Sequence, residues 1–250
     1  MNSGRNLIAA ILVLIMAMPL GVEAAGVGVK LDRAPVNIHD QESLQRGARV
    51  FVNYCLNCHS AGYMRYVRMT DIGLTEAQIK DNLLFAADKV GETMTVAMRK
   101  ADAKEWFGAA PPDLTVITRS RGADWVYTYL RTFYRDDTRP TGWNNLVFDK
   151  VGMPHVMQEL QGHLVPVVHE VTGEDGKPHQ VIDRLVLAKP GKMTLTEYDA
   201  LVADLVNYLT WMGEPAKAQR MRTGVAVILF LSMFFVVAFY LKREFWRDVH

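Results

Sequence analysis

The sequence is poor in cysteine and has almost no net charge. Only two of its 250 residues are cysteine, so a network of disulfide bonds cannot hold the fold together. Its 28 lysine and arginine residues nearly balance 27 aspartate and glutamate residues, and a formal net charge of +1 gives no reason to expect a nucleic-acid partner. Whatever the two cysteines do must therefore be local.

Long uncharged runs, by contrast, are present at both ends. Near the N-terminus, residues 7–20 are apolar, follow Arg5 and precede the small residues Ala24 and Ala25. This pattern is typical of a secretory signal peptide, which we place at residues 1–25. An uncleaved N-terminal anchor is the alternative, although the run is short for a membrane span.

The second run, residues 223–241, has no charged residue and is flanked by basic residues on both sides. It predicts one transmembrane helix followed by a short cytoplasmic tail, residues 242–250. The flanking basic residues are nearly balanced, so the signal peptide decides the orientation and exports residues 26–222. The expected location is the bacterial inner membrane, with the exported domain in the periplasm.

The exported region is expected to be mainly helical. Helices are predicted over residues 40–55, 75–90, 123–134 and 194–213 from helical spacing of apolar residues and from capping residues at their starts. Residues 162–188 differ, because two segments rich in β-branched residues flank a tight-turn signal, which predicts an inserted β-hairpin.

The two cysteines lie in the segment Cys55-Leu56-Asn57-Cys58-His59, at the end of the first predicted helix. Side chains three and four residues apart on a helical turn share one face. Covalent attachment of haem needs this spacing, because the cysteines form thioethers with the two vinyl groups and the following histidine binds the iron. The motif therefore favours a covalently bound haem c with His59 as the proximal ligand.

Two other uses of the cysteines have less support. A redox-active dithiol needs its cysteine pair at the start of a helix, which lowers the pKa of the first thiol, but this pair follows a helix. A structural zinc ion needs four ligands, and no second cysteine pair exists. The histidines beyond the motif lack a helical metal-binding spacing: His155, His163, His169 and His179.

A bound haem iron has a sixth coordination position. If a protein side chain fills it, electron transfer is favoured, whereas an open position would bind small ligands. Met153 is the leading candidate, because Gly152 before it permits a tight backbone and Pro154 after it restricts the chain. His155 and Met157 are neighbours that could take its place. Ordinary core packing is the alternative for any of the 13 methionines.

Taken together, these segments resemble the cytochrome c1 family, the membrane-anchored haem subunits of the ubiquinol:cytochrome c oxidoreductase (bc1) complex. The matching segments are RGARVFVNYCLNCHS, PPDL with arginines close behind, a Gly-Met-Pro segment, and ADLVNYLTWMGEP before the C-terminal span. Each is weak alone, but their order and spacing are specific. The resemblance implies a mainly α, class I cytochrome c-like haem domain with an inserted β-hairpin and one C-terminal transmembrane helix.

The resemblance also implies the site. Cys55 and Cys58 would bind one haem c covalently, with His59 and Met153 as the axial ligands of its iron. Two departures from the family pattern are visible. Many members have further prolines where this chain has His155, which keeps that residue open as a competing ligand. The tyrosine-rich segment before the loop reads GWNNL here, which leaves open which side chains cover the haem edge.

In the family, an arginine shortly after the PPDL segment contacts a haem propionate. The segment PPDLTVITRSR offers two arginines. Arg119 is the first choice and Arg121 the second, with a solvated surface position as the alternative.

The function that the resemblance implies is single-electron transfer in the respiratory chain. The haem would take an electron from a Rieske iron-sulfur protein and pass it to a soluble or membrane-tethered cytochrome c. Cytochrome b and the lipid bilayer are further expected partners, and dimerisation of the complex rests on the resemblance alone. The chain would be an enzyme only as a subunit of the quinol:cytochrome c reductase, since no side chain needs to act as an acid or base.

Two rival functions remain at this stage. One is a membrane-bound haem enzyme or gas sensor with an open distal site, and the other is a periplasmic dithiol oxidoreductase. The predicted hairpin at residues 162–188 could contact a partner subunit or cover the core.

Overall fold

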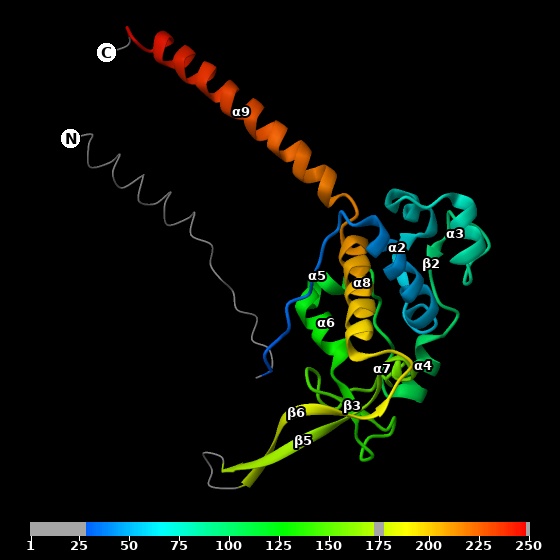
Figure 1. Cartoon of the computed structure of the whole chain (residues 1–250). Coiled ribbons are helices and arrows are strands. Elements are labelled where there is room, and N and C mark those ends of the chain that lie inside the picture. Colours follow the sequence, from blue (N-terminus) through cyan, green and yellow to red (C-terminus); the bar gives the residue numbers. More distant parts are fainter. Residues whose placement is uncertain (1–28, 173–177, 249–250) are drawn as a thin grey trace.

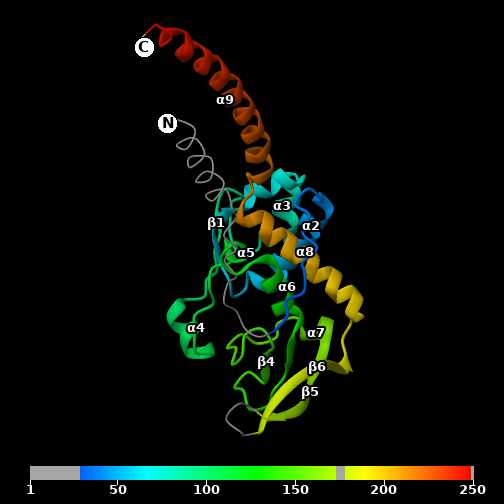
Figure 2. The ribbon, with the colours of Figure 1, turned by 90° about the vertical axis from the view of Figure 1, so that its left-hand side faces the viewer.

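A computed structural model describes residues 29–172 and 178–248, so the predicted signal peptide lies outside the described residues. A helical domain forms the body of the molecule (Figure 1). A β-hairpin and the long C-terminal helix α9 leave this body at opposite ends, as the view turned by 90° also shows (Figure 2). The mainly helical architecture with an inserted hairpin agrees with the sequence prediction.

The first described helix, α2 (Gln41–Val50), begins at the predicted cap. The carboxylate of Asp40 accepts a hydrogen bond from the backbone N–H of Ser43 at 3.0 Å, which satisfies one of the free donors of the first turn. The chain continues into the wider π-helical turn η1 (Phe51–Cys55). The predicted apolar face is buried throughout: Leu44, Ala48, Phe51 and Cys55.

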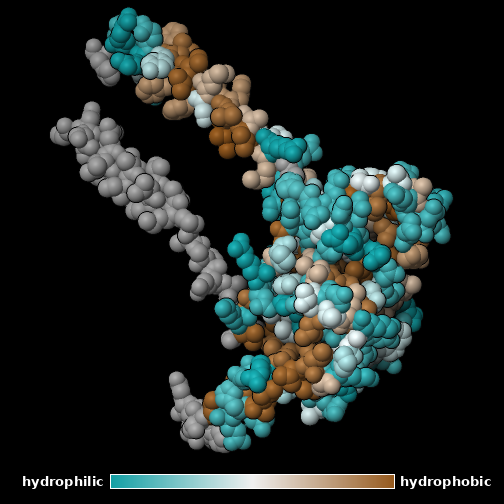
Figure 3. Space-filling view, viewed as in Figure 1, coloured by the Kyte–Doolittle hydropathy of each residue, from teal (hydrophilic) through white to brown (hydrophobic). Residues whose placement is uncertain are grey.

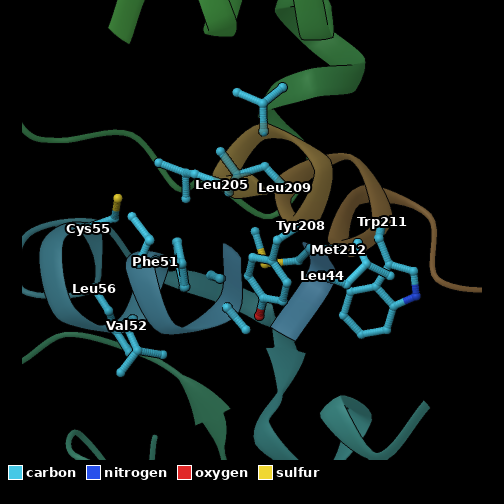
Figure 4. Packing of buried hydrophobic residues seen from close by; sticks show 14 of the residues in the cluster. Leu44, Phe51, Val52, Cys55, Leu56, Leu205, Tyr208, Leu209, Trp211 and Met212 are labelled. Carbon is cyan, nitrogen blue, oxygen red and sulfur yellow. The ribbon is translucent and has the colours of Figure 1, made fainter. Parts of the chain in front are cut away.

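Helix α8 (Leu195–Gly213) crosses α2 and forms the centre of the core. Its N-terminus has the predicted capping box between Thr194 and Glu197. The two helices approach closely at Gly47, where an added Cβ would overlap the backbone carbonyl of Asp204. Figure 4 shows the side chains of α2 and η1 meeting those of α8, with Cys55 at the edge of this cluster.

Two further helices, α5 (Ile117–Arg121) and α6 (Ala123–Arg131), pack on α8. Arg131 binds both carboxylate oxygens of Asp199 on α8, at 2.6 and 2.7 Å. It also binds Asp32 at 2.7 Å, which ties the extended N-terminal segment to both helices.

The predicted helix over residues 123–134 is too long, because Phe133 lies in a strand. The backbone leaves the helical region at Thr132, and β3 (Phe133–Arg135) then pairs antiparallel with β4 (Trp143–Asn145). Pairing with β4, a contact that helical periodicity does not report, ends α6 early. The Trp125 and Tyr129 side chains still lie four residues apart on α6, as predicted.

The region between the cysteine motif and α5 contains shorter elements. The helix predicted over residues 75–90 has its capping box at Thr75 but ends early, because Leu83 leaves helical geometry and turns its side chain into the core. The elements are β1 (Ala61–Arg65), the 3₁₀ segment η2 (Tyr66–Ile72), α3 (Glu76–Asn82), β2 (Thr93–Met94) and α4 (Lys100–Phe107). Strands β1 and β2 pair antiparallel.

The hairpin follows the short helix α7 (Gln158–Gln161). Strands β5 (Gly162–Thr172) and β6 (Pro178–Pro190) pair antiparallel, and the predicted turn at the tip lies outside the described residues. Only the base packs on the domain, where Leu164 is buried and the ring of His163 meets Trp143 edge-on at 5.3 Å. The hairpin prediction is therefore confirmed, and most of the hairpin stands clear of the core.

Helix α9 (Lys217–Phe245) contains the predicted span. The most apolar 18 residues within Gln219–Phe245 have a mean hydropathy of 2.6, and none of this stretch is buried inside the molecule. Figure 3 shows apolar surface along α9 between polar ends. Its length and composition fit a single-pass membrane anchor.

Candidate haem-binding site

A cavity of about 490 Å³ lies between η1 and α6 and reaches α8. Its wall includes the four side chains predicted to attach the haem or to bind its iron: Cys55, Cys58, His59 and Met153. Most of the remaining wall is apolar, from the loop after α4, from α6 and from the loop before α7. The volume is within the range of cofactor cavities, roughly 300–1,000 Å³.

The cysteine motif forms a closed turn at the end of η1. Backbone N–H groups of Cys58 and His59 both donate to the carbonyl oxygen of Cys55, at 3.1 and 2.8 Å. This turn brings three side chains, separated by three and four residues, to one side of the chain. In Figure 4 the sulfur of Cys55 points away from Val52 and Leu56, which pack into the core.

The two thiols form no disulfide bond. Burial raises the pKa of Cys55 to about 12 and also raises the pKa of Cys58. A dithiol oxidoreductase needs the opposite shift, because its attacking cysteine must be a thiolate near neutral pH. The electrostatics of the motif are therefore unsuited to thiol exchange.

His59 has the tautomer that an iron ligand needs. Its Nδ1 lies 2.8 Å from the carbonyl oxygen of Pro112, and because a carbonyl can only accept, Nδ1 carries the proton. The lone pair of Nε2 is then available to a metal, with the ring orientation fixed by the outer hydrogen bond. Burial lowers the pKa of His59, which favours the neutral ring.

The Pro112 carbonyl is itself held in place by the Pro-Pro-Asp-Leu loop. The carboxylate of Asp113 accepts hydrogen bonds from the backbone N–H groups of Gly62 at 2.7 Å and Thr115 at 2.8 Å. The N–H of Leu114 donates to the carbonyl of Ser60 at 2.9 Å. The loop is thereby fastened to the residues that follow the motif, so His59 and its partner move as one unit.

Met153 also lines the cavity, from the loop before α7. Gly152 is required there for close approach, since an added Cβ would lie 2.8 Å from the backbone carbonyl oxygen of Phe107 at the end of α4. Lys150 adopts φ +58°, a left-handed conformation that is uncommon outside glycine. The loop geometry is therefore specific, and it directs Met153 to the cavity.

Two buried asparagines, absent from the sequence prediction, shape this loop. Asn145 accepts hydrogen bonds from the N–H of Val147 at 2.9 Å and donates to the carbonyl of Tyr129 at 2.7 Å. Asn144 accepts from the N–H of Lys150 at 2.9 Å. These are the asparagines of the GWNNL segment, and consecutive asparagines in apolar surroundings were the signal available in the sequence.

Arg119 and Arg121 occupy different environments, although both follow the Pro-Pro-Asp-Leu loop. Arg121 lines the cavity and places its guanidinium 5.3 Å from the ring centroid of Trp125. Arg119 is absent from the cavity wall, and its side chain lies near Gly213 at the end of α8. The geometry thus favours the second choice, Arg121, over Arg119 as the cation at the cavity.

His155 and Met157 also lie away from the cavity wall. His155 is buried, stacks on Phe133 at 5.0 Å and meets Trp143 edge-on at 5.0 Å. Met157 is buried in the main hydrophobic core. Of the three candidates for the sixth position, only Met153 faces the same space as His59.

The site contains no alternative metal cluster. Within residues 29–172 and 178–248, no group of three or more His, Cys, Asp or Glu side chains converges as a metal site. The cavity fits a haem instead, with a mainly apolar wall, two thiols at thioether spacing, and a nitrogen and a sulfur donor among its lining side chains.

Comparison with known proteins assigns the family. The cytochrome C1 family matches residues 32–249, nearly the whole chain. The chain belongs to the cytochrome c1 family. It is 47% identical to cytochrome c1 of Allochromatium vinosum, an alignment covering 98% of this chain and 100% of that protein. It is also 49% identical, with the same coverage, to a protein named ammonia monooxygenase gamma subunit in Nitrosomonas europaea.

A more distant relative is a mitochondrial cytochrome c1 haem protein of Solanum tuberosum, 28% identical over 83% of this chain and 80% of that protein. Members of the cytochrome c1 family bind haem and act as electron-transfer subunits of the respiratory bc1 complex, which implies cytochrome b as a partner. The recognition from sequence motifs is thereby confirmed, as is the mainly α fold.

Proposed function

We propose that this chain binds one haem c and transfers single electrons from a Rieske iron-sulfur protein to a cytochrome c acceptor within the bc1 complex. The observation that carries the proposal is the convergence of Cys55, Cys58, His59 and Met153 on one cavity. When bound, the haem supplies a reversible one-electron couple. The chain supplies attachment, axial donors and a mainly apolar environment.

Each side chain has a defined part in this proposal. Cys55 and Cys58 would attach the haem as thioethers, and Nε2 of His59 and the sulfur of Met153 would bind its iron. Arg121 is placed to neutralise a propionate, a role for which Arg119 is less well situated. No proton transfer by a side chain is required.

The cavity reaches the surface at an apolar edge. Phe148 and Val156 line the cavity and are also exposed to solvent. Electron transfer between proteins requires a close approach of the two redox centres, and this edge offers such an approach. We propose that the Rieske protein and the acceptor cytochrome approach the site here.

The anchor restricts where the carrier can work. We propose that α9 crosses the bacterial inner membrane once, with the haem domain in the periplasm, residues 242–250 in the cytoplasm, and residues 1–25 removed as a signal peptide. The support is the exposed apolar surface of α9 together with the export signal in the sequence. The domain is then held close to cytochrome b.

A spectrum of the full-length protein in detergent tests the haem site. Covalent attachment predicts haem staining that survives denaturing electrophoresis, and methionine ligation predicts a near-infrared sulfur-to-iron charge-transfer band in the oxidised protein. Rapid binding of carbon monoxide by the reduced protein would overturn the proposed ligand set and favour a sensor or enzyme with an open site. Absence of stained haem would overturn the proposal as a whole.

The Nitrosomonas relative suggests a second assembly in which the same electron-transfer site could serve. That protein is named an ammonia monooxygenase gamma subunit. Affinity purification of this chain from membranes separates the two cases: cytochrome b and the Rieske protein should be recovered in stoichiometric amounts with the chain. Recovery of monooxygenase subunits in their place would favour the second assembly.

A further inference from the structure

One face of α6 forms a continuous part of the cavity wall. Trp125 and Tyr129, four residues apart on α6, both line the cavity, and Arg121, the last residue of α5, lines it next to Trp125. At the far end of this row, the hydroxyl of Tyr129 donates a hydrogen bond to the sulfur of Met153 at 3.4 Å. The row therefore ends directly on the proposed iron ligand.

The position of this hydroxyl is fixed by its surroundings. The ring of Tyr129 stacks on Trp125, with centroids 4.9 Å apart and planes 11° from parallel. Phe133 also contacts this ring edge-on, with centroids 5.0 Å apart. Such packing leaves the ring little freedom, because aromatic pairs in these geometries attract one another.

The backbone reinforces the same contact. The carbonyl of Tyr129 accepts a hydrogen bond from Asn145, the residue that also organises the loop leading to Met153. Asn145 thus links the backbone of Tyr129 to the loop that carries Met153, independently of the bond between the hydroxyl and the sulfur. Among the described residues, Met153 is the only hydrogen-bond partner of the Tyr129 hydroxyl.

A thioether sulfur has two lone pairs, so it can accept a hydrogen bond with one while the other binds a metal. A hydrogen-bond donor withdraws electron density from the sulfur and makes it a poorer donor to ferric iron. We propose that Tyr129 is a positioning residue that orients Met153 and favours the reduced state of the site. This inference rests on the proposed role of Met153 as axial ligand.

The test removes the hydroxyl and leaves the ring. Tyr129→Phe in the full-length haem protein should keep the near-infrared sulfur band and shift the ratio of reduced to oxidised protein, at fixed ambient potential, about 2- to 10-fold toward the oxidised form. This range corresponds to the net contribution of one hydrogen bond.

Tyr127→Phe is the matched control, because Tyr127 lies on the same helix but is absent from the cavity wall. It should leave the ratio unchanged. Substitution of Tyr129 by a ring-fluorinated tyrosine, measured below neutral pH, should shift the ratio the other way, because its more acidic hydroxyl is a stronger donor. These results together would support the inference.

Two outcomes would overturn it: an unchanged ratio in Tyr129→Phe with the sulfur band retained, or equal shifts in Tyr129→Phe and Tyr127→Phe. Failure of the proposed function looks different, because the wild-type protein would then lack the sulfur band. A wild-type protein without the sulfur band would exclude Met153 as the ligand, and the inference about Tyr129 would fail with it.

Discussion

The two walls of the cavity are constructed in different ways. The His59 wall, residues 54–62 with the Pro-Pro-Asp-Leu loop, is organised by hydrogen bonds within one turn and by a loop fastened to it. The Met153 wall, residues 143–154 with α6, is also held by contacts between separate segments, such as Gly152 with Phe107, but it contains no cysteine.

We therefore expect the His59 wall to control haem attachment and the Met153 wall to control the redox properties of the site. The His59 wall carries both cysteines and continues directly from α2, so its integrity depends on the crossing of α2 and α8. The Met153 wall carries no covalent link, so changes there should alter the redox properties while haem stays attached. Four substitutions test this division, beginning with the one expected to have the largest effect.

Gly47→Ala should destabilise the fold most, because a methyl group at Gly47 overlaps the backbone of α8 and forces α2 away. We expect a loss of about 3 kcal/mol in the free energy of unfolding and reduced haem incorporation. Denaturant unfolding of the full chain in detergent measures the loss. Gly91→Ala is the control, since nothing lies within 4 Å of a Cβ there; equal stability of the two variants would contradict the close-packing argument.

Met153→Leu should act on the redox couple and leave attachment intact. Loss of the sulfur donor is expected to lower the midpoint potential by on the order of 0.1 V, within the roughly 0.8 V range that axial ligands span, and to permit carbon monoxide binding. Redox titration and haem staining measure the two effects separately. Met157→Leu is the control in the buried core. An unchanged potential in Met153→Leu would exclude Met153 as the ligand.

Arg121→Gln, at the end of α5, should have a smaller effect on the redox couple. Removal of a partly solvated cation beside the cavity should shift the ratio of reduced to oxidised protein about 2- to 5-fold toward the oxidised form, the scale of an exposed charge pair. Arg119→Gln should leave the ratio unchanged, because Arg119 is absent from the cavity wall. The reverse ranking in redox titrations would restore Arg119 as the propionate partner.

Of the four substitutions, His155→Leu should change stability and iron ligation least. Burial lowers the pKa of His155 to about 4, and its Nε2 is buried without a hydrogen-bond partner among the described residues. Replacing such a group by an apolar side chain of similar size should change the free energy of unfolding by less than about 1 kcal/mol. The near-infrared sulfur band should persist; its loss would mean that His155 contributes to ligation.

Features encoded over short distances were predictable from the sequence. The cap at Asp40, the capping boxes at Thr75 and Thr194, the hairpin and the apolar C-terminal helix all appear in the structure. Their termini were less predictable. The helix starting at Ala123 ends three residues early because β4 pairs with the following segment, a contact that local periodicity does not report.

The choice between Arg119 and Arg121 shows the same limit within the site. Both follow the same loop, but two residues on a helix are separated by about 200° around its axis, so they face opposite sides. Which side meets the cavity depends on how α5 docks on α8. The order of residues in the sequence favoured Arg119, because it comes first after the Pro-Pro-Asp-Leu loop.

The sequence by itself determined the proposed haem-attachment motif, because cysteines three residues apart and a following histidine specify one face of one turn. It also determined the anchor, because the apolar run is long enough to span a bilayer. Only the tertiary structure decided that Met153, with Tyr129 at its sulfur, lines the same cavity as His59 while His155 packs in an aromatic cluster. That outcome depends on packing between α6, α4 and the loop, whose residues are brought together only when the chain folds.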